Sequence, residues 1–463
     1  MELNESGIGA ASVARSNRKR NPVGSFPDKH SLTTPPSCHD STVGGINAEA
    51  GLAGESFMGR SAHWLNRERI KIYPRIVLGL IVVVFIAWVL LSKDMLDPQG
   101  KPLGADFIAF WAASHIALAG HAEDAYNLPS LFKAVQVAVP ASQSIFAWYY
   151  PPSFYLVVLP LALLPYLAAY LTFILSTLTC YLLVLRRVVF NTTAKWCLAA
   201  FPGLWMNVFH GQNAFLTAAL AGAAMLCLRR RPVLAGVFIG LLTLKPQLAV
   251  LFPVALLAIG AWRTLISAAL TALCFFGLGT AVLGTATISG CVASLGDARH
   301  FLESGVLPWA KMPSVFAFLR LLGTPVIGAY AVHGLIAAGA VFAVWYVWRR
   351  CADWELRGAA LFAATFLCSP YMYDYDLAWL AFPIGWLALT GLRTSWLRGE
   401  REGLVAAWLL PLAMDPVATV LHVQIAPFVL MTLLAIAVRR AARSSRTATM
   451  VAHCQNSGFI SAQ

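Results

Sequence analysis

Long apolar segments alternate with short polar stretches from about residue 76 to residue 438. A helix needs roughly 17 to 25 mainly apolar residues to cross the hydrocarbon core of a bilayer. Segments 76–92, 166–185 and 265–283 have this length. Since a soluble domain cannot bury so many long apolar segments, the pattern predicts an all-α polytopic membrane protein.

About twelve spans follow from this pattern, with both ends of the chain on the same side of the membrane. The predicted spans are 76–92, 166–185, 196–209, 214–228, 233–244, 248–260, 265–283, 326–348, 358–368, 377–392, 404–414 and 417–438.

Two longer regions between spans are expected on the outer side. In the first, residues 93–165, segments 107–119 and 128–139 predict short interfacial helices. Prolines at 151, 152, 160 and 165 break the apolar stretch that follows and predict an interfacial or re-entrant piece. The second region covers 284–311 and precedes an interfacial helix at 314–322.

The charges orient the chain. Of its residues, 59% are hydrophobic and 12% are charged, with a net charge of +13. In a soluble protein this excess would indicate nucleic-acid binding, but Lys and Arg gather at span ends, which fits the positive-inside rule. We therefore expect a multi-pass inner-membrane protein, with membrane lipids around it and no nucleic-acid partner. Few cations fall in the predicted external stretches: Lys93, Lys101, Lys133, Lys245, Arg299, Lys311 and Arg320.

Three parts are predicted along the chain. Residues 1–65 are rich in Ser, Gly, Pro and Asn and predict a disordered cytoplasmic tail. Residues 66–440 form the transmembrane domain, and 441–463 form a cytoplasmic C-terminal tail. The nine cysteines contain no CxxC pair, so we interpret them as small core residues rather than metal ligands or disulfides.

Asp106 follows the first span, in the stretch GADFIAFW at 104–111. A carboxylate just outside a membrane exit can be a catalytic base that faces a membrane-embedded substrate. The same residue can instead cap the helix that begins at Phe107. The residues alone leave both interpretations open.

Unusual polar residues gather on the predicted outer face. A charged residue in apolar surroundings costs about 2.5–3.5 kcal/mol on insertion scales, so such a group indicates a polar cavity with a cationic and an anionic side. The set comprises Asp106, His115, Tyr149, Tyr150, His210, Gln212, Asn213, Lys245, Gln247, Lys311, Asp374, Tyr375 and Asp376.

Each of these polar groups can also be explained without a role in function. Lys245 can pair with a phosphate or a carboxylate, or snorkel to the interface. Gly211-Gln212-Asn213 can be an ordinary turn, and Tyr149 and Tyr150 can be interfacial aromatic residues. The block Tyr373-Asp374-Tyr375-Asp376 suits sugar hydroxyls, because rings stack and carboxylates accept hydrogen bonds; it can also be an aromatic belt with a capping Asp.

Several kinds of chemistry have no motif here. HExxH, Walker, GxSxG and Rossmann patterns are absent from the sequence, so cytoplasmic nucleotide chemistry is not supported. We predict no cofactor and no metal site, although the carboxylates of Asp106, Asp374 and Asp376 would have to be close together to hold a cation.

Five blocks in this order resemble glycosyltransferase family 87: ADFIAFWAA with the later AYN, YYPPSF, HGQNAFL, LKPQLAVLFP and SPYMYDYDLAW. The resemblance covers roughly residues 75 to 440. It implies a GT-C type bundle with periplasmic juxtamembrane helices, which moves a hexose, mannose in the familiar mycobacterial member, from a polyprenyl-phosphate donor to a lipid or glycan acceptor.

The resemblance also implies roles for single residues. Asp106 matches the catalytic aspartate of an inverting transfer, and Lys245 matches the KPQ block, which we place near the donor phosphate. Substrate binding is expected from Tyr149, Tyr150, His210, Gln212, Asn213, Lys245, Gln247, Tyr373, Asp374, Tyr375 and Asp376. Mycobacterial relatives carry two histidines where this chain has Tyr375 and Asp376, so sugar and acceptor identity do not carry over.

Two other classes of protein remain as alternatives. A transporter or lipid-linked sugar flippase also has intramembrane charges and broken helices, but the sequence shows no second copy of the DF, YYPP or KPQ blocks. A structural membrane subunit explains the composition but not the polar outer face.

Overall fold

The computed structural model describes residues 63–189 and 192–460, and within these ranges the chain is helical and has no β-strand. An all-α fold is therefore confirmed. The predicted N-terminal tail lies almost entirely outside the described residues. Most of the predicted C-terminal tail continues the last helix, α18 (Ala426–Ile460).

Among the residues that the structure describes, six helical segments are long and apolar enough to cross a membrane. Their count confirms a polytopic membrane protein but not the twelve spans predicted. They are Glu68–Leu91 within α1 (Arg67–Leu91), α5 (Tyr166–Leu185), α11 (Trp262–Leu283), α14 (Val326–Arg350), Asp374–Thr394 formed by η6 (Asp374–Leu380) and α16 (Ala381–Thr394), and α17 (Glu400–Leu421).

The other predicted spans correspond to shorter or broken helices. Proline begins several of these pieces, because it lacks the amide hydrogen and suits the first helical turn. The pieces are α6 (Thr192–Ala199), α7 (Pro202–His210), α8 (Ala214–Cys227), α9 (Pro232–Leu241), η3 (Leu242–Leu244), η4 (Pro246–Leu248), α10 (Leu251–Ala258) and α15 (Trp354–Cys368).

One predicted boundary is wrong. We expected separate spans at 404–414 and 417–438, with a reversal at Asp415 and Pro416. Instead α17 continues through Pro411 and Pro416, and the chain reverses at His422, which has a left-handed φ of 56°. Proline is tolerated inside a membrane helix where neighbouring groups satisfy the freed carbonyl, so Pro416 did not mark the helix end.

The helices predicted between spans near 107–119, 128–139, 151–165 and 314–322 are present, but α12 (Ala286–Ser304), a 19-residue helix in the second region, was not predicted. The first region holds α2 (Phe107–Leu118), η1 (Ala122–Tyr126), α3 (Leu128–Ala138), α4 (Pro152–Val158) and η2 (Leu159–Leu163); the second holds α12, η5 (Trp309–Lys311) and α13 (Val315–Leu321).

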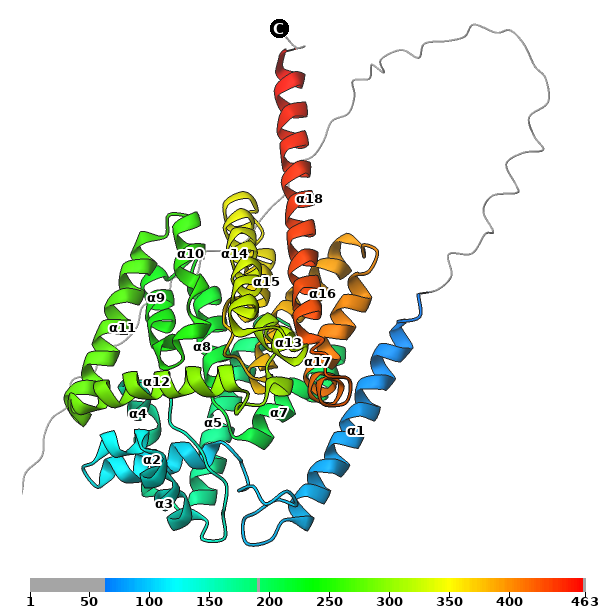
Figure 1. The fold of residues 1–463 in the computed structure, drawn as a ribbon. Helices are drawn as coiled ribbons and strands as arrows, with labels where there is room; N and C mark the ends of the chain where they lie inside the picture. The colour runs from blue at the N-terminus through cyan, green and yellow to red at the C-terminus, as the bar shows by residue number, and fades with distance from the viewer. Residues whose placement is uncertain (1–62, 190–191, 461–463) are drawn as a thin grey trace, which may run out of the picture. The chain divides into compact units, whose positions relative to one another are not determined.

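Figure 1 shows how these short helices are arranged relative to the long ones. The α2–α4 group lies at the lower left of the view, where α2 contacts α5, and α12 runs across the bundle above this group and contacts α11 and α4. α2, α3, α4 and the start of α5 share one hydrophobic core, while α8, α10, α15, α16 and α18 contribute to a larger one. The first core packs α2 against its neighbours at one end of the bundle.

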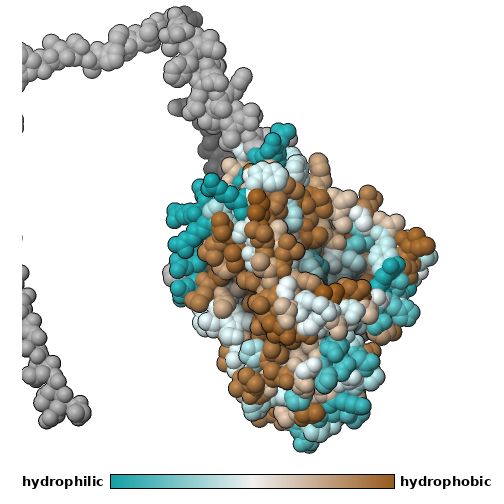
Figure 2. Space-filling model, turned by 90° about the vertical axis from the view of Figure 1, so that its left-hand side faces the viewer, coloured by the Kyte–Doolittle hydropathy of each residue, from teal (hydrophilic) through white to brown (hydrophobic). Residues whose placement is uncertain are grey.

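The outer surface is strongly apolar. Figure 2 shows hydrophobic side chains across much of one face, with hydrophilic patches towards its edges. On α11, Leu270 and Leu273 are 58% and 70% exposed. Such a surface fits contact with lipid rather than with water.

Candidate active site

Two of the predicted blocks meet where α2 begins against the end of α7. The backbone amide of Asp106 donates a hydrogen bond to the carbonyl of His210 at 3.0 Å. Gly211 follows with φ of +65°, and a Cβ atom there would lie 2.5 Å from Cβ of Phe107 and 2.6 Å from the carbonyl oxygen of Gly104. Only glycine fits this crossing without strain, so the DF and HGQN blocks are joined through their backbones.

Asp106 does not cap its helix. It stands at the N-cap position of α2 in a helical conformation, and its side chain makes no capping hydrogen bond. Its Oδ2 instead accepts a hydrogen bond from Nε2 of Gln212 at 3.0 Å. The capping interpretation is therefore wrong, and the half-buried carboxylate is held by a residue 106 positions later in the chain.

Tyr150 extends this contact into a chain of hydrogen bonds. Its hydroxyl donates to Oε1 of Gln212 at 3.0 Å, and its own carbonyl accepts from the hydroxyl of Tyr126 at 2.8 Å. Burial, and then the negative charges of Asp376 and Asp106, raise the pKa of Tyr150. The phenol therefore remains protonated and can hold the Gln212 amide with its nitrogen towards Asp106.

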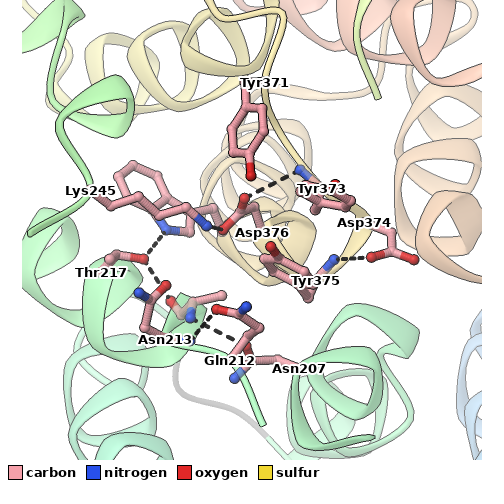
Figure 3. Close-up of polar contacts among 12 residues, drawn as sticks. Asn207, Gln212, Asn213, Thr217, Lys245, Tyr371, Tyr373, Asp374, Tyr375 and Asp376 are labelled. Atoms are coloured by element: carbon pink, nitrogen blue, oxygen red, sulfur yellow. Dashed lines mark hydrogen bonds and ion pairs between the residues drawn. The ribbon is translucent and has the colours of Figure 1, made fainter. Parts of the chain in front are cut away.

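Lys245 lies at a break in the helix between η3 and η4 and forms a buried ion pair. Its Nζ is 2.5 Å from Oδ1 of Asp376, and it lies 4.8 Å from the centre of the Tyr375 ring. Lys245 is 4% exposed and Asp376 is 0% exposed. A buried charge needs a partner, so of the predicted alternatives the structure shows pairing with a carboxylate, not snorkelling. Figure 3 shows the lysine side chain reaching across to η6.

Asp374 lies apart from this pair. Figure 3 shows its side chain on the other side of Tyr375 from Lys245. One carboxylate oxygen accepts the amide of Tyr375 at 2.8 Å, while Oδ2 is buried without a hydrogen-bond partner among the described residues. His210 and Lys311 are its cationic or titratable neighbours. The two carboxylates of the block thus have different surroundings.

A row of tyrosines connects the YYPP block with the last block. Ring centroids are 6.3 Å apart for Tyr149 and Tyr371, 5.6 Å for Tyr371 and Tyr373, and 5.4 Å for the stacked pair Tyr373 and Tyr375. Burial, helped by the charge of Asp297, raises the pKa of Tyr149 to about 12. Tyr371 was not among the predicted site residues, although it lies inside the same block.

Of the remaining predicted residues, His210 and Asn213 lie at the site, whereas Gln247 makes no hydrogen bond to it in the described part of the chain. The ring of His210 lies 5.5 Å from that of Tyr375. Asn213 is fully buried, and neither atom of its amide group has a hydrogen-bond partner in the described part of the chain. Beside it, Asn207, which we did not predict, accepts the amide of Ala214. No hydrogen bond of the described residues links Gln247 to this group, so its predicted role gains no support.

His115 lies away from Asp106, and the three predicted site carboxylates do not come together. His115 stacks on Trp111, with ring centroids 5.0 Å apart, towards the far end of α2 from Asp106. Asp106, Asp374 and Asp376 do not form a group of three metal-ligating side chains in residues 63–189 and 192–460, where no such group is found.

The fold and these contacts define a class: a helical membrane protein with buried charged groups beside a half-buried carboxylate. Residues 148–370 match the model of glycosyltransferase family 87. The predicted resemblance is thereby confirmed over this segment, which is a glycosyltransferase family 87 domain. The matched segment includes Tyr150, Gln212 and Lys245, but it begins after Asp106 and ends before Asp374. No curated protein and no solved structure matches the chain.

Proposed function

We propose that the protein transfers a hexose, with mannose as the family precedent, from a polyprenyl-phosphate donor to a lipid or glycan acceptor. The transfer takes place at the periplasmic face of the inner membrane, within a GT-C type bundle. The main supporting observation is the state of Asp106. Its carboxylate is half-buried, is not used as a helix cap, and is oriented by Gln212, which is itself held by Tyr150.

In the proposed reaction Asp106 is the general base. The acceptor hydroxyl oxygen attacks the anomeric carbon and forms the new glycosidic bond, while its proton passes to Asp106. The bond between the anomeric carbon and the phosphate oxygen breaks, and the polyprenyl phosphate leaves from the opposite face of the sugar. A positioned base contributes on the order of 10²–10⁴ to the rate.

Lys245 is proposed to act on the donor phosphate through a charge that Asp376 holds in place. The break in the helix at Lys245 supports this role, because irregular backbone at membrane depth is tolerated where it is buried in protein or lines a cavity. Departure of phosphate builds negative charge, which an ammonium group at this place stabilises. The tyrosine row and Asp374 are proposed to contact sugar hydroxyls.

Membranes that contain the protein, incubated with a radiolabelled polyprenyl-phosphate hexose, test the proposed reaction. We expect label to appear in a new lipid or glycan product, identified by mass spectrometry, and in no such product from membranes without the protein. A transporter, which the broken helices also suit, would move the label across the membrane without a new covalent product. That outcome would overturn the proposal.

A further inference from the structure

A large apolar cavity lies between α1 and the bundle, away from the candidate active site. It has a volume of about 1530 Å³ and is lined by the first half of α1, the end of α5, α6, α16 and the first half of α17. The hydroxyl of Tyr166, at the start of α5, binds the carbonyl of Leu103 near Asp106, whereas Thr179 to Leu185 at the other end line the cavity. The 20 residues of α5 rise roughly 30 Å, so the two sites lie at opposite ends of the bundle.

The charges of the cavity all have one sign. No Asp or Glu is among its lining residues, whereas its cations are Arg69, Lys71, Arg186, Lys195 and Arg401. Lys71 is already paired with Glu68 on the same helix. Arg401 lies over the ring of Trp396 and also interacts with the neighbouring carboxylate of Glu402, which does not line the cavity. The positive charge at this cavity therefore favours an anionic ligand.

The walls of the cavity suit hydrocarbon chains. Ile76, Leu183 and Leu392 are 55%, 46% and 67% exposed, and only 6% of the apolar part of α1 is buried within the protein. In a membrane these side chains face lipid or whatever occupies the cavity. An occupant with apolar chains and an anionic head matches both the walls and the cations.

We propose that this cavity binds an anionic phospholipid from the membrane leaflet at the basic end of the bundle, which is the end that carries Arg69, Arg186 and Arg401. Its acyl chains fill the space between α1 and α5, α16 and α17, and its phosphate lies among Arg69, Arg186 and Arg401. Each basic residue near a membrane surface contributes about five-fold to the binding of an anionic lipid. The proposal does not depend on the transferase reaction, because it concerns the other end of the molecule.

Photo-crosslinking in vesicles tests the site. The full chain is reconstituted in phosphatidylcholine that contains a trace of phosphatidylglycerol with a diazirine in one acyl chain. We expect crosslinks on the peptides around Leu183 and Leu392. Excess unlabelled phosphatidylglycerol should compete, and phosphatidylcholine with the same acyl chains should not.

Variants separate a specific site from general attraction. Arg186→Gln and Arg401→Gln should each weaken competition by about five-fold, while Arg186→Lys and Arg401→Lys, which keep the charge, should retain it. Arg230→Gln with Arg231→Gln removes two exposed cations that do not line the cavity, and we expect no change. Equal labelling by the two phospholipids, or an equal loss in the Arg230 and Arg231 control, would overturn the proposal.

Discussion

Within residues 63–189 and 192–460 two ion pairs have both side chains buried, and the surroundings of these pairs differ. At the basic end, the Glu400 carboxylate of α17 accepts hydrogen bonds from Nε of Arg440 at 2.8 Å and from the backbone amide of Leu397 at 2.9 Å. Arg440 also donates hydrogen bonds to the side chain of Thr394 and the carbonyl of Ser395. Near Asp106, the Lys245 ammonium has one carboxylate and one aromatic ring as partners. Close to it in the fold, Asn213 and Asp374 have buried polar atoms that make no hydrogen bond within the described part of the chain.

This difference separates a structural clamp from a binding site. The Arg440 guanidinium is satisfied by Glu400, Thr394 and Ser395, so it joins α18 to the start of α17 and needs no further partner. Buried polar groups that lack partners are costly and require an explanation, which a polar substrate would supply. Four predictions test the contrast between the two ends.

The largest effect is expected from Asp106→Asn. The rate of sugar transfer should fall by about 10²–10⁴ because the general base is lost. The thermal unfolding temperature should stay the same, since an Asn side-chain oxygen can still accept the hydrogen bond from Gln212. Transfer kinetics and thermal unfolding of the purified protein provide the measurements. Asp124→Asn, an exposed carboxylate in η1, is the matched control, and near wild-type transfer by Asp106→Asn would remove Asp106 from the mechanism.

Glu400→Gln should destabilise the fold by about 3–5 kcal/mol, because it leaves buried arginine charge without its partner. Activity per folded molecule should not change. Denaturation followed by fluorescence measures the first effect, and transfer normalised to folded protein measures the second. Combining it with Arg440→Met should recover part of the stability. A loss of activity per folded molecule would show that the basic end takes part in the reaction.

Lys245→Met should weaken donor use by about 10- to 100-fold, as expected for loss of a charge-assisted contact worth roughly 1.5–3 kcal/mol. The double variant Lys245→Met with Asp376→Asn removes both charges of the pair. If Lys245 acts on the donor phosphate, the double variant stays defective although its stability recovers. Initial rates at varied donor concentration decide this, and full recovery of donor use would make the pair a structural clamp like that of Glu400 and Arg440.

The smallest effect on the protein is expected from two cysteine replacements, which test the side of the membrane on which each end of the bundle lies. Lys101→Cys, in the loop before α2, and Arg230→Cys, after α8, both replace exposed residues in a background without other cysteines. An impermeant thiol reagent should label position 101 in intact cells and position 230 only after the inner face is opened. Labelling of position 230 from outside would reverse the proposed orientation.

Sequence patterns predicted the helical class and most helix positions, since apolar segment length is a local property. They also predicted the short helices that begin at Phe107 and Leu128. They failed at Pro416, because whether proline ends a membrane helix depends on neighbouring groups that satisfy the backbone. Tyr371 was missed because the prediction selected residues next to the charged Asp374 and Asp376, and Tyr371 is three residues away from the nearer of them.

The sequence by itself determined the membrane class, the family resemblance and the identity of the polar groups. It left Asp106 as a cap or a base, and Lys245 as a phosphate ligand, a carboxylate partner or a snorkelling side chain. Tertiary structure decided the contacts, because Gln212 lies 106 residues from Asp106 and Asp376 lies 131 from Lys245. Only the close crossing at Gly211 and the folding of η6 against the broken helix at Lys245 bring those side chains within hydrogen-bonding distance.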